Sequence, residues 1–467
     1  MATFSIENFG CRATEADAAA LRHGLLTSGL MLVHDHRSAD LVVLNTCTVT
    51  AAADSQTRDA VRKIHHANPA ARIIVTGCYA QRAPEEIAAL DGVSWVIGNS
   101  HQTEIPKIAG ELTAQSSTGT AFAALAAEKD FVPVSLLDAG QMSLARGPAK
   151  ILTGDIFAQT SVQIAPSAVV EGDRTRPVLK IQDGCNNRCA YCVIPLVRGR
   201  SRSLPPAAVV AEVQKLVGAG SREIVLSGIN LGAYGRDLSP RSGLSDVVHR
   251  ILEETPLEQL RLSSIEPQDV TEELISLVAS SDRLAPHFHV PLQSGSDRIL
   301  RAMHRWYRAD HYAERVKRIR RIVPGAAIGA DVIVGFPGET QEDFQHTVEL
   351  IEHLPFTYLH VFSFSARPGT AGANLAAPVP GTIIRDRART LRALSQRKSS
   401  EFRASQAGRT LRALTLAGGG HTWTTAMTAN YLKSRIPGRL PANQWHEICL
   451  SSDESSMAEF AAANFQE

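Results

Sequence analysis

The chain has 467 residues, 44% hydrophobic and 20% charged, which are ordinary proportions for a folded globular protein of several domains. Its formal net charge is +1, so no global field draws it to nucleic acid, and any such contact must depend on local basic patches. The first residues lack the basic and apolar regions of a signal peptide, and no apolar run approaches the roughly 18 residues of a membrane span. We therefore expect a cytoplasmic protein with no membrane partner, in which clustered cysteines bind metal rather than form disulfides.

Residues 1–105 alternate short buried strands with helices. Apolar runs bounded by glycine or polar residues predict strands at Thr3–Phe9, Leu41–Asn45 and Arg72–Thr76. The helical patterns that follow them span about 14–28, 53–67 and 84–90. This alternation predicts a small doubly wound parallel sheet.

Residues 106–176 are rich in Ala, Ser and Thr with weak periodicity, and we interpret them as a partly ordered connector. In residues 177–405 the alternation resumes, with helices such as Ala207–Gly218 and Ala309–Ile322. The six strands predicted there are Val178–Gln182, Glu223–Ser227, Leu260–Ser264, Phe288–Leu292, Ala327–Val334 and Tyr358–Phe362. Six repeats fall short of the eight of a closed barrel, so we predict an open, partial barrel.

The C-terminal part begins after a basic helical stretch at 383–406. Residues 406–450 contain short Gly- and Thr-rich strands, which predict a small β-barrel-like appendage. The acidic tail, 451–467, is expected to fray.

Three cysteines, Cys185, Cys189 and Cys192, form a C-x3-C-x2-C run. Each iron of a 4Fe–4S cluster takes one thiolate, so three cysteines leave one iron open to a ligand from outside the protein. A structural zinc site closes with four protein ligands, and a three-ligand zinc site recruits His or carboxylate, which the loop does not contain. Unrelated buried cysteines are disfavoured because the Gly, Asn and Arg around them do not make a core. We predict a cluster with an open iron.

Three more cysteines, Cys11, Cys47 and Cys78, each directly follow a predicted strand. The carboxyl ends of parallel strands share one edge, so these thiols are expected to converge there. Glycine before two of them allows the backbone to approach a bulky cluster. The alternative is that each is a small apolar residue at a strand end. The sequence predicts a second three-cysteine site, whereas Cys449 is expected to pack in the appendage.

The Cys185–Cys192 loop resembles that of the radical SAM superfamily. The settings of the other trio resemble the methylthiotransferases more narrowly, and they read Gly10-Cys11, Asn45-Thr46-Cys47-Thr48-Val49 and Thr76-Gly77-Cys78-Tyr79-Ala80-Gln81. Further matching segments are Arg198–Ser203, Leu226–Asn230, Ser263–Pro267, Val290–Ser296 and Asp331–Glu339. The appendage resembles the family's RNA-binding TRAM domain only through Asn430–Lys433, and Thr14 stands where the family commonly has Asn.

The Arg198–Ser203 segment, together with Cys47–Thr50 and Thr76–Gln81, looks most like the branch that modifies N6-threonylcarbamoyladenosine at position 37 of tRNA, next to the anticodon. The resemblance implies insertion of a methylthio group at C2 of that base by radical chemistry. The branch acting on isopentenyladenosine-37 and the branch acting on a ribosomal-protein aspartate remain alternatives. A different class, an Fe–S redox-sensing RNA-binding protein, would explain the thiols but not the retained Ser264, Glu266 and Gln293.

The resemblance also implies the cofactors, which are S-adenosylmethionine and two 4Fe–4S clusters. The six cysteines of the two trios would be the catalytic metal ligands, and the second cluster would carry the sulfur to be inserted. The residues implied to contact S-adenosylmethionine are Tyr191, Ser227, Gly228, Ser264, Glu266 and Gln293. Local basic residues suggest phosphate contacts with the tRNA anticodon loop, and the candidates are Arg198, Arg200, Arg202 and Arg305. An electron donor such as flavodoxin or ferredoxin and a sulfur donor are the other expected partners of a monomeric enzyme.

Overall fold

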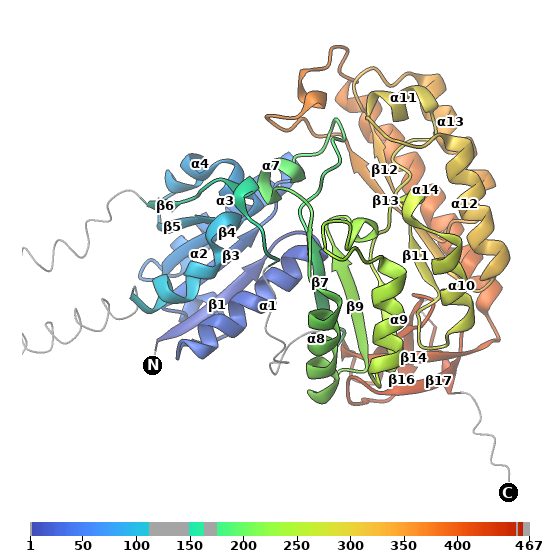
Figure 1. Ribbon diagram of the computed structural model, residues 1–467, viewed down its shortest axis with the longest axis horizontal. Coiled ribbons are helices and arrows are strands. Elements are labelled where there is room, and N and C mark those ends of the chain that lie inside the picture. The colour runs from blue at the N-terminus through green and yellow to red at the C-terminus, as the bar shows by residue number, and fades with distance from the viewer. Residues whose placement is uncertain (1, 112–148, 163–174, 454–455, 461–467) are drawn as a thin grey trace, which may run out of the picture. The chain divides into compact units, whose positions relative to one another are not determined.

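The computed structural model describes residues 2–111, 149–162, 175–453 and 456–460 (Figure 1). The chain forms two compact units, and the residues in and around the Cys185–Cys192 loop are divided between them. The first unit comprises Met1–Pro166, Gly184–Asn186 and Val193–Arg200. The second unit comprises Ser167–Asp183, Asn187–Cys192 and Ser201–Glu467.

The first unit is built on a parallel sheet with the strand order β2-β1-β3-β4-β5-β6. Its strands are β1 (Thr3–Asn8), β2 (Met31–Leu32), β3 (Leu41–Thr46), β4 (Arg72–Gly77), β5 (Val93–Gly98) and β6 (Lys150–Leu152). Val42 and Leu44 of β3 pack in the core formed with α2 (Ala51–Ala67), whereas Leu41 and Val43 pack with α1 (Arg12–Thr27). Burial on both faces explains the continuous apolar runs and confirms the predicted parallel sheet.

Three strands of this sheet were not predicted, and the first of them is the short edge strand β2. Strand β5 was not expected, and β6 comes from the segment predicted to be a connector. Residues 150–152 pair in parallel with the edge of β5, from Trp95 to Ile97, so the sheet recruits this part of the connector as its last strand. The rest of that segment, 112–148 and 163–174, lies outside the described residues.

The second unit contains the predicted open barrel. Its six parallel strands are β7 (Val178–Asp183), β9 (Glu223–Gly228), β10 (Gln259–Leu262), β11 (His287–His289), β12 (Ala327–Val334) and β13 (Tyr358–Ser363). They form two ladders, β10-β9-β7 and β11-β12-β13, which single bridges at Leu260–Leu284 and Ser264–His289 join into one series. A short strand, β8 (Arg202–Ser203), adds to β7 in antiparallel fashion.

Helices follow these strands, as expected for a βα barrel, and Figure 1 shows them on the outside of the strands. They are α8 (Pro206–Gly218), α9 (Leu244–Glu254), α10 (Glu272–Ser280), α11 (Asp297–Ala302), α12 (Ala309–Ile322) and α13 (Gln341–His353). The predicted bounds of β12 and α12 are confirmed, whereas β11 begins earlier and ends at His289, before the predicted end. Beyond His289, pairing with β12 resumes at a single bridge between Gln293 and Val332, where Gln293 adopts a positive φ of 64°.

The C-terminal part follows the long helix α14 (Gly381–Gln406). Its antiparallel strands are β14 (Thr410–Gly419), β15 (Trp423–Thr428), β16 (Lys433–Pro437), β17 (Trp445–Cys449) and β18 (Glu459–Phe460). The sheet order is β16-β15-β14-β17-β18, and a bridge between Arg435 and Met457 draws its two ends together. The appendage is therefore a curled half-barrel sheet. Residues 454–455 and 461–467 of the predicted tail lie outside the described residues.

Candidate active site

Cys11, Cys47 and Cys78 lie at one edge of the parallel sheet in the first unit. The register pairs Thr46 of β3 with Gly77 of β4, so the cysteines that follow them are neighbours. Cys11 precedes α1, and a side chain at Gly10 would meet the Cys47 Cβ at 2.7 Å. The three strand ends therefore converge as predicted.

Electrostatics also places these thiols near one another. Burial, together with negative charge on the two other thiols, raises the pKa of Cys47 to about 12. Burial likewise raises the pKa of Cys78. Thiolates are the form that binds iron, and a bound cation offsets their mutual repulsion. A trio of soft sulfur donors, of which Cys47 and Cys78 are buried and Cys11 is exposed, fits an Fe–S cluster.

Cys78 receives two hydrogen bonds within the first unit. Arg198, at the end of α7 (Ile194–Arg198), donates from Nε to the Cys78 Sγ at 3.3 Å. Its Nη2 is 2.7 Å from Asp17 Oδ2, and both side chains of this ion pair are 2% exposed. Asn99 donates to the same sulfur at 3.5 Å and to the carbonyl of Val197 at 2.8 Å. The segment that follows Cys192 in sequence is thus anchored beside Cys78.

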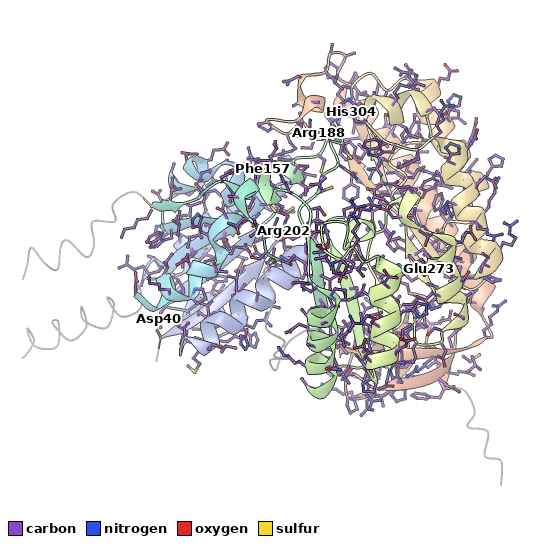
Figure 2. The ribbon with its side chains drawn as sticks, viewed as in Figure 1. Asp40, Phe157, Arg188, Arg202, Glu273 and His304 are labelled. Carbon is purple, nitrogen blue, oxygen red and sulfur yellow. The ribbon has the colours of Figure 1, made fainter. Side chains whose placement is uncertain are left out.

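The two parts of the C-x3-C-x2-C loop, before and after the boundary between Asn186 and Asn187, are held by different backbone contacts. In the first unit, the Cys185 amide donates to the carbonyl of Gly199 at 3.0 Å. In the second unit, the Ala190 amide donates to the carbonyl of Met303 at 3.0 Å. Figure 2 labels Arg188, whose carbonyl accepts a 3.1 Å hydrogen bond from Nδ1 of His304. Backbone contacts therefore fix each part of the loop.

Arg305 is the polar centre of the loop's second part. Its Nη1 is 3.3 Å from the Cys189 Sγ and 3.5 Å from the Tyr191 hydroxyl. The same guanidinium forms a two-pronged ion pair with Glu266, and Arg305 lies over the Tyr307 ring at 5.0 Å from its centroid. Burial raises the pKa of Glu266, and the charge of Arg305 opposes that rise. Arg305, Tyr191 and Glu266 thus gather around Cys189.

The other residues implied to contact S-adenosylmethionine lie at strand ends of the barrel. Ser227 and Gly228 end β9, and a side chain at Gly228 would meet Gln182 Oε1 at 2.8 Å. Ser264 follows β10 and bridges to His289. Two backbone hydrogen bonds hold Gln293 in its left-handed conformation. The Gln293 N–H donates to the Asp331 carbonyl, and the Ile333 N–H donates to the Gln293 carbonyl. Backbone strain of this kind in a non-glycine residue is common at functional sites.

The arginines expected to meet phosphate have different settings in the structure. Three of the four are buried and paired with carboxylates, and these pairs are Arg198–Asp17, Arg202–Asp183 and Arg305–Glu266. Arg202, labelled in Figure 2, lies 3.3 Å from Asp183 Oδ2. Buried guanidinium groups in ion pairs are poorly placed to bind phosphate. Arg200 is exposed and stays the candidate for that contact.

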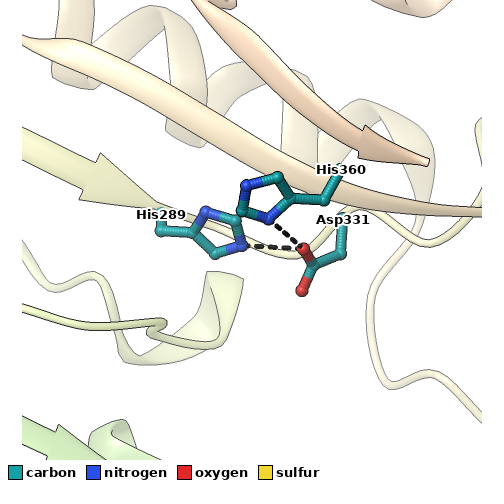
Figure 3. A group of neighbouring side chains, drawn as sticks. All are labelled: His289, Asp331 and His360. Carbon is teal, nitrogen blue, oxygen red and sulfur yellow. Dashed lines mark hydrogen bonds and ion pairs between the residues drawn. The ribbon is translucent and has the colours of Figure 1, made fainter. Parts of the chain in front are cut away.

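A polar cluster on three barrel strands was not identified from the sequence. It consists of His289 on β11, Asp331 on β12 and His360 on β13, with both imidazoles directed at one carboxylate oxygen (Figure 3). Burial alone would raise the pKa of Asp331, yet the two histidines hold it below its ordinary value. The missed signal was polar residues at alternate positions in apolar strands, since His287 and His289 are two apart and Asp331 interrupts β12.

Two family descriptions match the sequence. Residues 3–98 match the Uncharacterized protein family UPF0004, and residues 179–351 match the Radical SAM superfamily. A Threonylcarbamoyladenosine tRNA methylthiotransferase MtaB of Aquifex aeolicus is 36% identical over 434 residues, covering 93% of this chain and 96% of its own. A protein of the same name from Bacillus subtilis is 35% identical and covers 87% and 83%. A tRNA-2-methylthio-N(6)-dimethylallyladenosine synthase of Thermobifida fusca is 33% identical and covers 90% and 78%.

The fold is also similar to that of a solved enzyme. The radical S-adenosylmethionine methyltransferase TsrM of Kitasatospora setae superposes with a TM-score of 0.55 at 16% identity, over 80% of this chain and 77% of that one. At this identity the likeness concerns the fold alone. Among the described residues, no helix combines the length and apolarity needed to cross a membrane.

Proposed function

Because the chain belongs to the methylthiotransferase family of the radical SAM superfamily, we propose that it inserts a methylthio group at C2 of N6-threonylcarbamoyladenosine-37 in tRNA. The superfamily uses S-adenosylmethionine and a 4Fe–4S cluster. We propose a second 4Fe–4S cluster in the N-terminal unit. A flavodoxin or ferredoxin and a sulfur donor would serve the enzyme in the cytoplasm.

One observation carries this proposal. Cys11, Cys47 and Cys78 converge at the carboxyl edge of the first unit's sheet, in a chain that also has the C-x3-C-x2-C loop. A single three-thiol site would suffice for cleavage of S-adenosylmethionine. A second such site is what a sulfur-inserting enzyme requires in addition, and a simple redox sensor would not need both.

The residues divide this chemistry between them. Cys185, Cys189 and Cys192 would hold the cluster that binds S-adenosylmethionine, and the other trio would hold the second. When bound, these groups supply the radical and the sulfur, which acid–base chemistry cannot provide at an unactivated aromatic C–H. The chain's own side chains would orient the cysteine ligands and keep water away from them. Arg305 and Glu266 fix the surroundings of Cys189, and Arg198 fixes those of Cys78.

The choice of adenosine substituent has support from the barrel strands. An isopentenyl group is apolar, whereas a threonylcarbamoyl group carries a urea, a hydroxyl and a carboxylate. The cluster of His289, Asp331 and His360, with the Tyr358 hydroxyl beside it, offers hydrogen-bonding and charged groups that a threonylcarbamoyl group can contact and an isopentenyl group cannot. This setting favours the polar substituent.

The experiment compares tRNA from a strain that lacks the gene with tRNA from complemented strains. Mass spectrometry of nucleoside digests should show loss of the methylthio mark on threonylcarbamoyladenosine and its return with the wild-type gene. Cys11→Ala and Cys189→Ala should fail to restore it, and Cys449→Ala, outside both trios, should restore it. An unchanged tRNA profile in the deletion strain would overturn the substrate assignment.

A further inference from the structure

The cluster of His289, Asp331 and His360 lies on the inner face of the barrel strands. The outward-facing residues of β12 are apolar and fully buried, and they are Ile328, Ala330, Val332 and Val334. Alternation along a strand therefore directs Asp331 to the opposite face. The register pairs Asp331 with His360 of β13 and Gly329 with His289 of β11, which brings the three side chains together.

The spacing between the Asp331 oxygen and each imidazole nitrogen is close to that of two ligands on one metal ion. Asp331 Oδ1 is 3.0 Å from His289 Nε2 and 3.2 Å from His360 Nδ1, and a ligand atom from each residue lies within 4.8 Å of the others. Tetrahedral ligands about 2.0–2.1 Å from a zinc ion are about 3.3 Å apart. Two imidazoles and a carboxylate are a ligand set used for zinc and non-haem iron.

Neighbouring residues support one imidazole in the way that metal-binding histidines are supported. Tyr358 Oη lies 3.1 Å from Nδ1 of His289, and 2.8 Å from Nε2 of His287. A hydrogen bond at the second ring nitrogen fixes the ring's orientation and tautomer. The Tyr358 ring reaches these histidines by crossing Gly329, where an added Cβ would meet it at 2.0 Å. The absence of a side chain at position 329 is therefore part of the arrangement.

We propose that His289 Nε2, Asp331 and His360 Nδ1 bind one divalent first-row metal ion of the zinc or ferrous class. The site has a closed side and an open side, because the side chains of His289, Asp331 and His360 are 9%, 24% and 55% exposed. Three protein ligands leave a coordination position for an oxygen from water or from substrate. This ion is distinct from the irons of the two thiolate trios, since its ligands are nitrogen and oxygen.

The open position would accept a carboxylate, and this second step rests on the proposed function. The threonyl carboxylate of the substrate is an anion that would otherwise meet the Asp331 carboxylate. A divalent cation between them removes that repulsion and binds both groups. Isopentenyladenosine has no such oxygen and would leave the ion unaffected.

The test uses the full-length chain with the six trio cysteines replaced by serine, because those thiols would themselves bind the probe. Titration with Co²⁺ should give visible d–d absorption that saturates at one equivalent. Asp331→Asn keeps an oxygen that accepts both hydrogen bonds but removes the charge, and it should weaken Co²⁺ binding by more than about tenfold. Tyr358→Phe should weaken binding by about 10–100-fold. His249→Gln, on the exposed face of α9, should not change binding.

A measurement on the enzyme with both clusters completes the test. After chelation and reloading with Zn²⁺, elemental analysis should find one zinc per chain in the wild type and none in Asp331→Asn, at equal iron content. Circular dichroism confirms that each variant folds. Absence of Co²⁺ binding, or equal binding in the wild type and Asp331→Asn, would overturn the metal site and leave a hydrogen-bonded cluster.

The substrate step has its own readout. Threonylcarbamoyladenosine should shift the absorption of the Co²⁺ complex, and isopentenyladenosine should not. If Co²⁺ binds but neither nucleoside shifts its spectrum, the carboxylate role is wrong and the metal site stands. The tRNA digests test the proposed function separately, because they do not depend on this ion.

Discussion

Each three-cysteine site has one sulfur that accepts a hydrogen bond from a buried arginine, and each arginine is paired with a carboxylate. In the first unit, Arg198 joins Cys78 to Asp17. In the second unit, Arg305 joins Cys189 to Glu266. The two arrangements share their chemistry, although the residues come from unrelated parts of the chain.

They differ in how far they are closed to water. Both side chains of the Arg198–Asp17 pair are 2% exposed, whereas Glu266 is 17% exposed beside a 2% exposed Arg305. Cys78 is 2% exposed, while Cys189 is partly exposed. A site that must admit S-adenosylmethionine needs an accessible iron, so the more open surroundings of Cys189 suit that role. In the other trio Cys78 and Cys47 are buried and Cys11 is exposed, so Cys78 marks the closed side of that site.

The largest expected effect is on stability, and it tests the difference in burial. Arg198→Met removes the counter-charge of Asp17 and should lower the local free energy of unfolding around α1 and the end of β4 by about 3–5 kcal/mol. Arg305→Met should cost less, about 1.5–3 kcal/mol, because Glu266 retains contact with water. Hydrogen exchange of the cluster-free chain, read by mass spectrometry, measures both values locally.

The double variant Asp17→Leu/Arg198→Met serves as the control for this prediction. It removes both charges, so much of the lost stability should return. If Arg198→Met and Arg305→Met cost the same, the two pairs do not differ in the way that their exposures indicate.

Reduction potentials provide a second comparison of the two arginines. Positive charge and hydrogen bonds at a cluster sulfur favour the reduced state. In a chain lacking the C-x3-C-x2-C cysteines, Arg198→Met should lower the midpoint potential of the remaining cluster by tens of millivolts, where about 59 mV is a tenfold change. The redox titration is followed by electron paramagnetic resonance.

Arg198→Lys is the matched control for the potential because it keeps the charge, and its shift should be smaller. Arg305→Met, in a chain lacking the other trio, should shift its own cluster less, since water around Cys189 screens the charge. An unshifted potential in Arg198→Met would mean that Arg198 has only a structural role.

A third prediction concerns the strained backbone at the open end of the barrel. Gln293 has a φ of 64°, which glycine adopts without strain. Gln293→Gly should raise the free energy of unfolding by about 1 kcal/mol, because glycine relieves the backbone strain. It should also weaken S-adenosylmethionine binding, because the side-chain carboxamide of Gln293 is lost. Thermal unfolding and equilibrium binding measure the two effects.

Ala377→Gly is the control for this change, since Ala377 has a similar φ of 61°. It should stabilise the chain by a comparable amount without altering cofactor binding. A Gln293→Gly variant that binds S-adenosylmethionine normally would remove Gln293 from the site.

The contrast between the two arginines also shows what the sequence could predict. The convergence of Cys47 and Cys78 followed from strand pattern alone, because carboxyl ends of parallel strands share an edge. Arg198 was expected to meet phosphate because it directly follows the Cys185–Cys192 loop, with Arg200 and Arg202 after it. Its carboxylate, Asp17, lies 181 residues away, and no local pattern reveals that contact.

The polar cluster on the inner face was missed for a related reason. His289, Asp331 and His360 come from three strands, one residue from each, so only the register between β11, β12 and β13 brings them together. The open six-stranded barrel was predicted correctly because that prediction did not require the register between strands. Fold class depends on the periodicity of many residues, whereas this cluster depends on three pairings.

The smallest expected effect belongs to Arg200, the exposed arginine of the Arg198–Ser203 segment, in which Arg198 and Arg202 are buried. A single phosphate contact to an unpaired loop contributes about 0.7 to the slope of log affinity against log salt concentration. Arg200→Ala should lower the slope of tRNA binding by about that amount and leave both clusters intact. Arg241→Ala, another exposed arginine of the chain, should leave the slope unchanged. If the two variants have equal slopes, Arg200 makes no phosphate contact, and the tRNA must be bound through other surfaces than the segment after the C-x3-C-x2-C loop.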